Sequence, residues 1–205
     1  MSHLGQNGGC VLAMCGKDCV SIATDHRFGI RAETISTDFK KVFQMNPQVL
    51  LGMTGLQANI ITVRDHMIFR KNMYELGESR DIAPKPFTAI LSNFLYEHRF
   101  GPYYVEPIVA GLDPITSEPY VCRLDHYGCC NKCDDFAVSG TCFEQLYGIC
   151  ESLWSPNMDQ NELFNVTAHA IVSACNRDAM SGFGATIYVM DKDKLVERTL
   201  KMRMD

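Results

Sequence analysis

The order in which strand-like and helical patterns follow one another is the feature that most restricts the fold of this chain. Short apolar or alternating segments predict strands at 11–24, 41–54, 105–112, 119–124, 135–139, 184–190 and 195–202. Apolar residues at helical spacing predict helices at 56–76, 86–99, 141–154 and 159–176, and Gly77 is expected to end the first of them. The chain therefore runs through strands, a helix pair, strands, a second helix pair and a final strand pair.

This order predicts a layered fold. An amphipathic helix must bury one face against a sheet, and each sheet must have its other face covered. Two antiparallel sheets packed face to face, with a helix pair outside each sheet, satisfy both needs. The predicted fold class is therefore α+β, a four-layer αββα sandwich, although layering alone leaves other α+β folds open. We expect a short N-terminal tail over 1–8 and a single domain over 9–205.

Composition excludes several classes of protein. A chain of 205 residues, 46% of them hydrophobic, suits one domain with a substantial core. The formal net charge of −5 argues against a nucleic acid as partner. No apolar run approaches the ~20 residues of a membrane-spanning helix, so no membrane partner is expected. The first ten residues lack the basic-then-apolar layout of a signal peptide, and nothing directs the chain out of the cytosol.

The chain contains ten cysteines, which is a high number for its length. Without a signal peptide, reduced thiols are the preferred interpretation. A central group consists of Cys122, Cys129, Cys130, Cys133 and Cys142. Its C-x-x-C pair could begin a zinc site, but no second pair and no paired histidines follow at the required spacing. A zinc-binding module therefore remains only an alternative hypothesis.

Four short motifs carry side chains that handle protons. They are Ala-Thr-Asp-His-Arg with Asp25, Asp-Phe-Lys-Lys-Val with Lys41, Val-Ser-Gly-Thr with Ser139, and Arg-Asp-Ala-Met-Ser-Gly with Asp178 and Ser181. The set is typical of N-terminal-nucleophile hydrolases, in which the first residue of the mature chain supplies a hydroxyl or thiol. Its free α-amine, with a pKa of about 8, then serves as the base. Gly9 occupies that place here and has no side chain that could attack a carbonyl.

Longer blocks of sequence identify the family. They are GGCVLA at 8–13, GMTG at 52–55, LYEHRFGPYY at 95–104, EPIVAGLDP at 106–114 and CESLW at 150–154. With the motifs above, they resemble the beta subunits of the eukaryotic 20S proteasome, and among these a non-catalytic member. The resemblance covers nearly the whole chain and implies the N-terminal-nucleophile hydrolase fold.

The resemblance also implies a role for each motif residue. In active members the first threonine attacks, a lysine lowers the pKa of its hydroxyl, and an aspartate orients the lysine. Lys41 and Asp25 match the last two, and a supporting serine–aspartate–serine trio is matched by Ser139, Asp178 and Ser181. Because Gly9 replaces the nucleophile, we expect no catalysis. The charges are expected to persist as scaffold, since a buried charge left unpaired costs roughly 3–5 kcal/mol.

The family also implies partners and a location. We expect one position in a seven-membered beta ring, with contacts to other beta subunits, to an alpha ring and to the opposite beta ring. The expected function is assembly and shaping of the chamber in which other subunits degrade proteins, in the ubiquitin-dependent pathway, in cytoplasm and nucleus. Asp125 and Cys129 are expected to line a neighbour's substrate pocket. No cofactor is required, although backbone carbonyls of Cys175, Asp178 and Ser181 could hold a structural Mg²⁺.

An enzymatic alternative uses Cys10. Cleavage after Gly9 would expose an N-terminal cysteine, which is a competent nucleophile. The register argues against it, because Gly9 lies sixteen residues before Asp25, as in the catalytic members. A shift of one residue along a strand sends the side chain to the opposite face, away from Lys41. Ser2 is a second formal candidate, but its position seven residues earlier favours an ordinary terminus.

Overall fold

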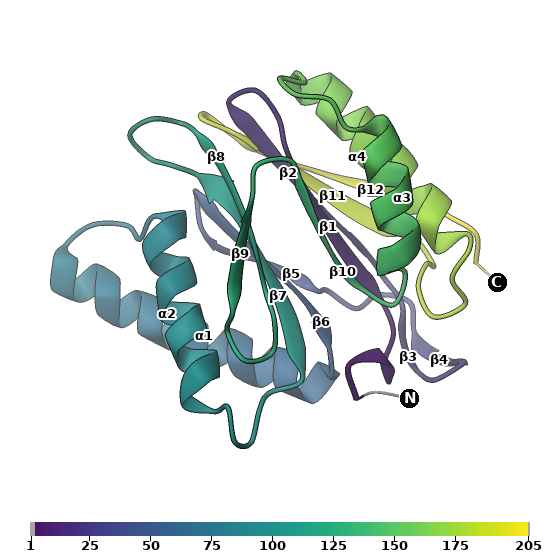
Figure 1. The fold of residues 1–205 in the computed structure, drawn as a ribbon, viewed down its shortest axis with the longest axis horizontal. Coiled ribbons are helices and arrows are strands. Elements are labelled where there is room, and N and C mark those ends of the chain that lie inside the picture. Colours follow the sequence, from purple (N-terminus) through teal and green to yellow (C-terminus); the bar gives the residue numbers. More distant parts are fainter. Residues whose placement is uncertain (1–2, 205) are drawn as a thin grey trace.

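Two five-stranded antiparallel sheets lie at the centre of the molecule, and a pair of helices covers the outer face of each (Figure 1). The structure is a computed structural model that describes residues 3–204. The first sheet contains, in order, β10 (Phe136–Gly140), β1 (Cys10–Cys15), β2 (Cys19–Asp25), β11 (Ala185–Asp191) and β12 (Leu195–Leu200). The second contains β5 (Val42–Asn46), β6 (Val49–Gly55), β7 (Val105–Leu112), β8 (Pro119–Leu124) and β9 (Cys130–Cys133).

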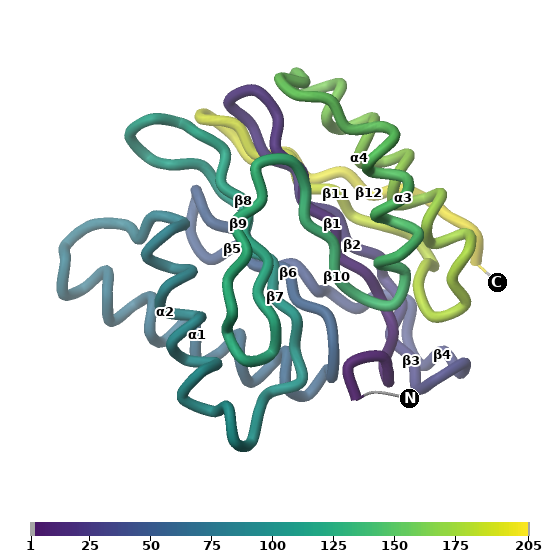
Figure 2. The backbone as a smooth tube through the Cα atoms, viewed as in Figure 1, coloured from purple at the N-terminus to yellow at the C-terminus, as the bar shows by residue number. Residues whose placement is uncertain are grey.

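The helices form the two outer layers. They are α1 (Gln57–Glu78) and α2 (Pro84–Glu97) on the second sheet, and α3 (Phe143–Leu153) and α4 (Gln160–Cys175) on the first. The backbone trace in Figure 2 shows the two helix pairs on opposite sides of the strands. The predicted four-layer αββα sandwich is therefore confirmed. None of the helices in residues 3–204 is both long and apolar enough to cross a bilayer.

Strand β1 illustrates why the sequence folds into layers. All six of its residues are buried, because both faces of the first sheet are covered. Cys10, Leu12 and Met14 face α3 and α4, whereas Val11 and Ala13 pack between the two sheets. Successive side chains of a strand point to opposite faces, so β1 contributes apolar side chains both to the layer under the helices and to the layer between the sheets.

Three strands and one helix end differ from the prediction. The hairpin of β3 (Phe28–Ile30) and β4 (Glu33–Ser36) and the edge strand β9 were not predicted. These strands have three or four residues and are largely exposed, so they carry no apolar alternation. The prediction that Gly77 ends the first helix is wrong. The helix continues to Glu78, and Ser79 adopts the left-handed conformation that ends it.

The predicted tail is, over residues 3–8, packed against the domain. A short 3₁₀ helix, η1, spans His3–Gly5. The side chain of Asn7 donates to the carbonyl of Gly29 at 2.9 Å and accepts from the backbone N–H of Gln57 at 3.0 Å. These bonds tie the N-terminal segment to β3 and to the start of α1. Ser2 lies outside the described residues.

Candidate functional site

Gly9, Asp25 and Lys41 meet at one end of the inter-sheet layer. Gly9 precedes β1, Asp25 ends β2, and Lys41 directly precedes β5. A Cβ atom placed on Gly9 would lie 3.0 Å from Nζ of Lys41 and 3.2 Å from Oδ1 of Asp25. The structure therefore places residue 9 beside the lysine and the aspartate, the two residues with which the family resemblance groups it.

Asp25 and Lys41 form a fully buried ion pair. Nζ of Lys41 donates to Oδ1 of Asp25 at 2.8 Å and to its carbonyl at 3.0 Å, and neither side chain is exposed. The carboxylate also accepts from the backbone N–H groups of Cys10 at 2.8 Å, Gly182 at 3.1 Å and Arg27 at 3.2 Å. A buried carboxylate needs several donors to offset its lost hydration, so Asp25 joins β1, β2 and the loop at residue 182.

The backbone of Gly9 is engaged on both sides. Its N–H donates to the carbonyl of Met180 at 2.9 Å, and its carbonyl accepts from the N–H of Thr141 at 2.9 Å. Its φ of +106° lies in a region that residues with a Cβ rarely adopt. With Gly8 before it in the chain, the nitrogen of Gly9 is an amide rather than a free amine. Gly9 itself has no side chain that could act as a nucleophile.

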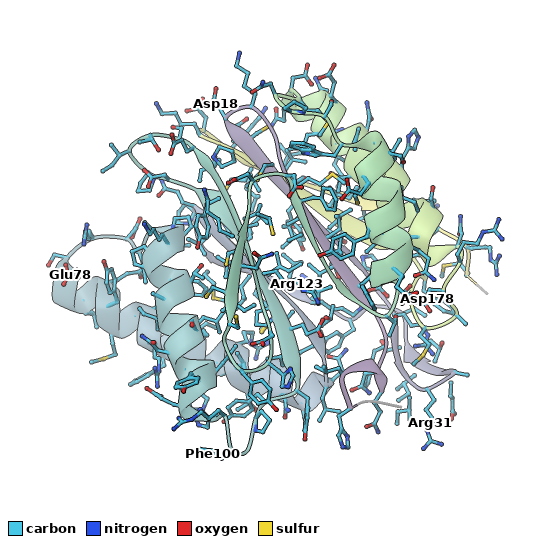
Figure 3. All side chains as sticks on the ribbon, viewed as in Figure 1. Asp18, Arg31, Glu78, Phe100, Arg123 and Asp178 are labelled. Carbon is cyan, nitrogen blue, oxygen red and sulfur yellow. The ribbon has the colours of Figure 1, made fainter. Side chains whose placement is uncertain are left out.

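The serine–aspartate–serine trio is not joined by hydrogen bonds among its own members in the described residues. Ser139 bonds the hydroxyl of Thr54 and donates to Oε2 of Glu106 at 3.1 Å. Asp178 instead accepts from the hydroxyl of Thr141 at 2.6 Å (Figure 3 labels Asp178). The hydroxyl of Ser181 is buried and has no hydrogen-bond partner among residues 3–204.

Two structural residues were missed at the sequence level. Glu106 in β7 accepts from Ser139 and pairs at 3.4 Å with Arg123 in β8, which is labelled near the centre of Figure 3. Arg27 is fully buried, and its guanidinium donates to the carbonyls of Met180 at 3.1 Å and Arg31 at 2.9 Å. Arg27 stands in the same motif as Asp25, which was the available signal, whereas no local pattern marked Glu106.

Cys10 faces away from the ion pair. Its side chain packs under α3 and α4, and its sulfur lies 3.5 Å from that of Cys175. The orientation predicted from the one-residue register shift is therefore confirmed. Hydrogen bonds with Cys10 and Cys175 lower the pKa of Cys142 to about 5. The bond to Cys142, the bond to Cys175 and burial raise the pKa of Cys10.

The central cysteines do not converge as the zinc hypothesis required. Within residues 3–204, the group of three metal-ligating side chains that lie close together is Cys10, Cys142 and Cys175. Cys142 thus belongs to a different cluster from its sequence neighbours. Cys129 and Cys130 are exposed, and all ten cysteines are free thiols.

Asp125 and Cys129 lie together in the exposed turn between β8 and β9. Oδ1 of Asp125 accepts from the N–H groups of Tyr127 at 2.9 Å and Cys129 at 2.8 Å. The N–H of Asp125 donates to the carbonyl of Cys129 at 3.2 Å. One carboxylate oxygen, Oδ1, therefore accepts both of these backbone bonds within the turn.

Comparison with known proteins places the chain in a family. Residues 6–190 match the family model described as proteasome subunit. Three curated relatives are each named "Proteasome subunit beta type-3". The Drosophila melanogaster protein is 64% identical and the Caenorhabditis elegans protein 47% identical, with both chains covered fully. The Saccharomyces cerevisiae protein is 45% identical over 97% of each chain. The chain therefore belongs to the proteasome subunit family, in its group of beta type-3 subunits.

Proposed function

We propose that this chain is a non-catalytic, structural subunit of the 20S proteasome beta ring. It supports assembly and shapes the chamber in which other subunits degrade proteins, in ubiquitin-dependent proteolysis. One observation supports the proposed absence of catalysis. The residue beside Lys41 and Asp25 is Gly9, which has no side chain and whose amide N–H donates a hydrogen bond to the carbonyl of Met180. A cysteine hydrolase gains no support, because Cys10 faces the helices. A zinc-binding module built on the central cysteines gains none either, because no three of these cysteines lie together as metal ligands within residues 3–204.

The proposed partners are other beta subunits of the same ring, alpha-ring subunits and the opposite beta ring. Large apolar side chains support such contacts, because an exposed apolar surface is stabilised when a partner covers it. Phe100 is 90% exposed at one edge of Figure 3, Ile115 is 91% exposed and Leu76 is 79% exposed. Native mass spectrometry of the chain purified at its endogenous level tests the proposal. A particle of many different subunits supports it, and a lone active monomer contradicts it.

The mature chain should keep its N-terminal segment up to Gly9. Self-cleavage needs a hydroxyl or thiol that can attack the preceding carbonyl. Gly9 has none, and the sulfur of Cys10 is buried on the opposite face of β1. Intact mass of the chain from assembled particles should therefore include these residues, whereas a chain that begins at Cys10 would disprove the expectation.

The proposed location is cytoplasm and nucleus. All ten cysteines are free, including Cys10 and Cys175, whose sulfurs are only 3.5 Å apart. Closely spaced free thiols fit a reducing compartment. Imaging of the endogenously tagged chain tests this, and accumulation in a secretory compartment would contradict it.

The turn of Asp125 and Cys129 is proposed to line a neighbouring subunit's pocket for basic side chains. The exposed carboxylate has one oxygen that the turn does not use, and a carboxylate attracts cationic groups. The residue could thus act on a substrate that this chain does not itself cleave.

The substitution Asp125→Asn should weaken cleavage after basic residues by the assembled particle about tenfold. Loss of one charge-assisted hydrogen bond in a partly desolvated pocket costs ~1–2 kcal/mol. The amide oxygen can still accept the two turn bonds, so the turn should persist. Fluorogenic peptides with Arg, Leu or Glu before the bond measure the effect. Asp134→Asn, at an exposed acid outside the turn, is the matched control. If particles with wild-type and Asp125→Asn chains cleave the Arg peptide at equal rates, Asp125 has only a structural role in the turn.

No cofactor is proposed to be required, although a structural Mg²⁺ fits the segment after α4. Cys175, Asp178 and Ser181 line one cavity of about 580 Å³. Backbone carbonyls in such a segment are the oxygen ligands that Mg²⁺ takes, and a single acid would add charge. The carbonyls of Cys175, Asp178 and Ser181 would hold the ion, which would stiffen the segment and take no part in chemistry.

A further inference from the structure

Three cysteines far apart in the sequence bring their sulfurs together beneath the helix pair of the first sheet. Cys10 begins β1, Cys142 is the N-cap residue directly before α3, and Cys175 is the last residue of α4. Their sulfurs all lie within 4.8 Å of one another, and those of Cys10 and Cys175 are 3.5 Å apart. Cys10 and Cys142 are fully buried, and Cys175 is 5% exposed.

These separations suit a single metal ion. Zinc–sulfur bonds of about 2.3 Å in a tetrahedral site set the sulfurs about 3.8 Å apart, which falls within the range found here. Soft thiolate ligands select thiophilic ions over hard ones such as Mg²⁺. The cluster is therefore chemically distinct from the backbone oxygens of the same segment.

A fourth group points to the same place. The hydroxyl of Ser181 lies beside the sulfur of Cys142. It is buried and has no partner of ordinary hydrogen-bond geometry among residues 3–204. A buried polar atom without a partner is costly, so the position favours a ligand that the oxygen could contact. Cys175 and Ser181 also line the cavity of about 580 Å³, which offers an entry path for an ion.

We propose that Cys10, Cys142 and Cys175 bind one thiophilic divalent ion, Zn²⁺, with the oxygen of Ser181 at the fourth position. Binding forms three Zn–S bonds, and each sulfur that carries a proton releases it to solvent as it becomes a thiolate ligand. Three thiolates and one divalent ion leave one negative charge, and the N-terminus of α3 at Cys142 favours an anion there. The ion ties β1 to the start of α3 and the end of α4, and this role is independent of the proposed function in the ring.

The test uses the full chain with its accessible thiols removed by Cys129→Ser, Cys130→Ser and Cys133→Ser. After incubation with Zn²⁺ and dialysis against excess Mg²⁺, bound zinc is measured by elemental mass spectrometry. We expect about one ion per chain. Cys142→Ala should retain about a tenth of that or less, because two thiolates cannot complete the site. Cys150→Ala is the matched control, since Cys150 is equally buried in the same core and lies outside the cluster.

A second measurement needs no substitution within the cluster. Co²⁺ loaded in place of zinc should give the thiolate-to-metal absorption of three sulfur ligands in a near-tetrahedral visible spectrum. Failure of the background chain to retain zinc would overturn the proposal, as would equal retention by Cys142→Ala and Cys150→Ala. A Cys10–Cys175 disulfide in peptide mapping of the chain as purified, without metal, would also overturn it. If Cys142→Ala does not fold, the cobalt spectrum decides.

Discussion

Replacing Asp25 by alanine should destabilise the fold by about 3–5 kcal/mol, the cost of leaving a buried charge without its partner. Lys41 is fully buried and bonds the carboxylate at 2.8 Å. The substitution also removes the acceptor of three backbone N–H groups, those of Cys10, Arg27 and Gly182, and buried donors without partners are costly. Urea unfolding of the full chain, followed by circular dichroism, measures the loss.

Two further variants test the cause. Lys40→Met removes a neighbouring exposed lysine and should change stability by no more than about 0.5 kcal/mol. Lys41→Met added to Asp25→Ala should cost less than Lys41→Met in the wild type, because it removes the uncompensated ammonium. A coupling of more than ~1 kcal/mol is expected. Strict additivity of the two substitutions would show that the charges are not a coupled pair.

Gly9→Thr should leave the chain inactive and should also destabilise it, although it rebuilds the nominal nucleophile. The Cβ would lie only 2.4 Å from Cε of Lys41, so the lysine or the backbone must move. The φ of +106° adds strain of roughly 1–3 kcal/mol for a residue with a side chain. The backbone nitrogen of residue 9 remains an amide that donates a hydrogen bond to the carbonyl of Met180, so it cannot act as a base. In addition, displacing a catalytic group by about 1 Å can lower the rate ~100-fold.

Covalent labelling by an epoxyketone or boronate inhibitor, inside assembled particles, tests whether the threonine at position 9 acts as a nucleophile. Labelling of the Gly9→Thr chain would prove the prediction wrong. Gly77→Ala is the control for glycine replacement, since Gly77 is helical and nothing lies within 4 Å of an added Cβ. It should be neutral or stabilise the chain by up to about 1 kcal/mol.

Elements with a strong local pattern could be predicted from the sequence. In 86–99 the apolar spacing marks one helix face, and Phe87, Leu91 and Phe94 are buried there as expected. Strand β9, with the sequence Cys-Asn-Lys-Cys, has no such pattern. Its strand conformation depends on pairing with β8, from Val121 opposite Cys133 to Leu124 opposite Cys130. A short exposed strand forms only where a neighbour offers hydrogen bonds, and that neighbour is set by the fold.

The sequence by itself predicted the order of strand groups and helix pairs, and its motifs and longer blocks identified the family. The grouping of Gly9 with Asp25 and Lys41 came from that resemblance. Hydrophobic periodicity and the alternation of faces along a strand are local properties, so they can be recognised in the sequence without a structure. Only the tertiary structure decided that Ser139 pairs with Glu106, that Asp178 pairs with Thr141, and that Cys10 meets a sulfur 165 residues away. Such contacts depend on the loops and on the stacking of helices against sheets, and no spacing along one chain encodes the distance between two side chains brought together by different elements.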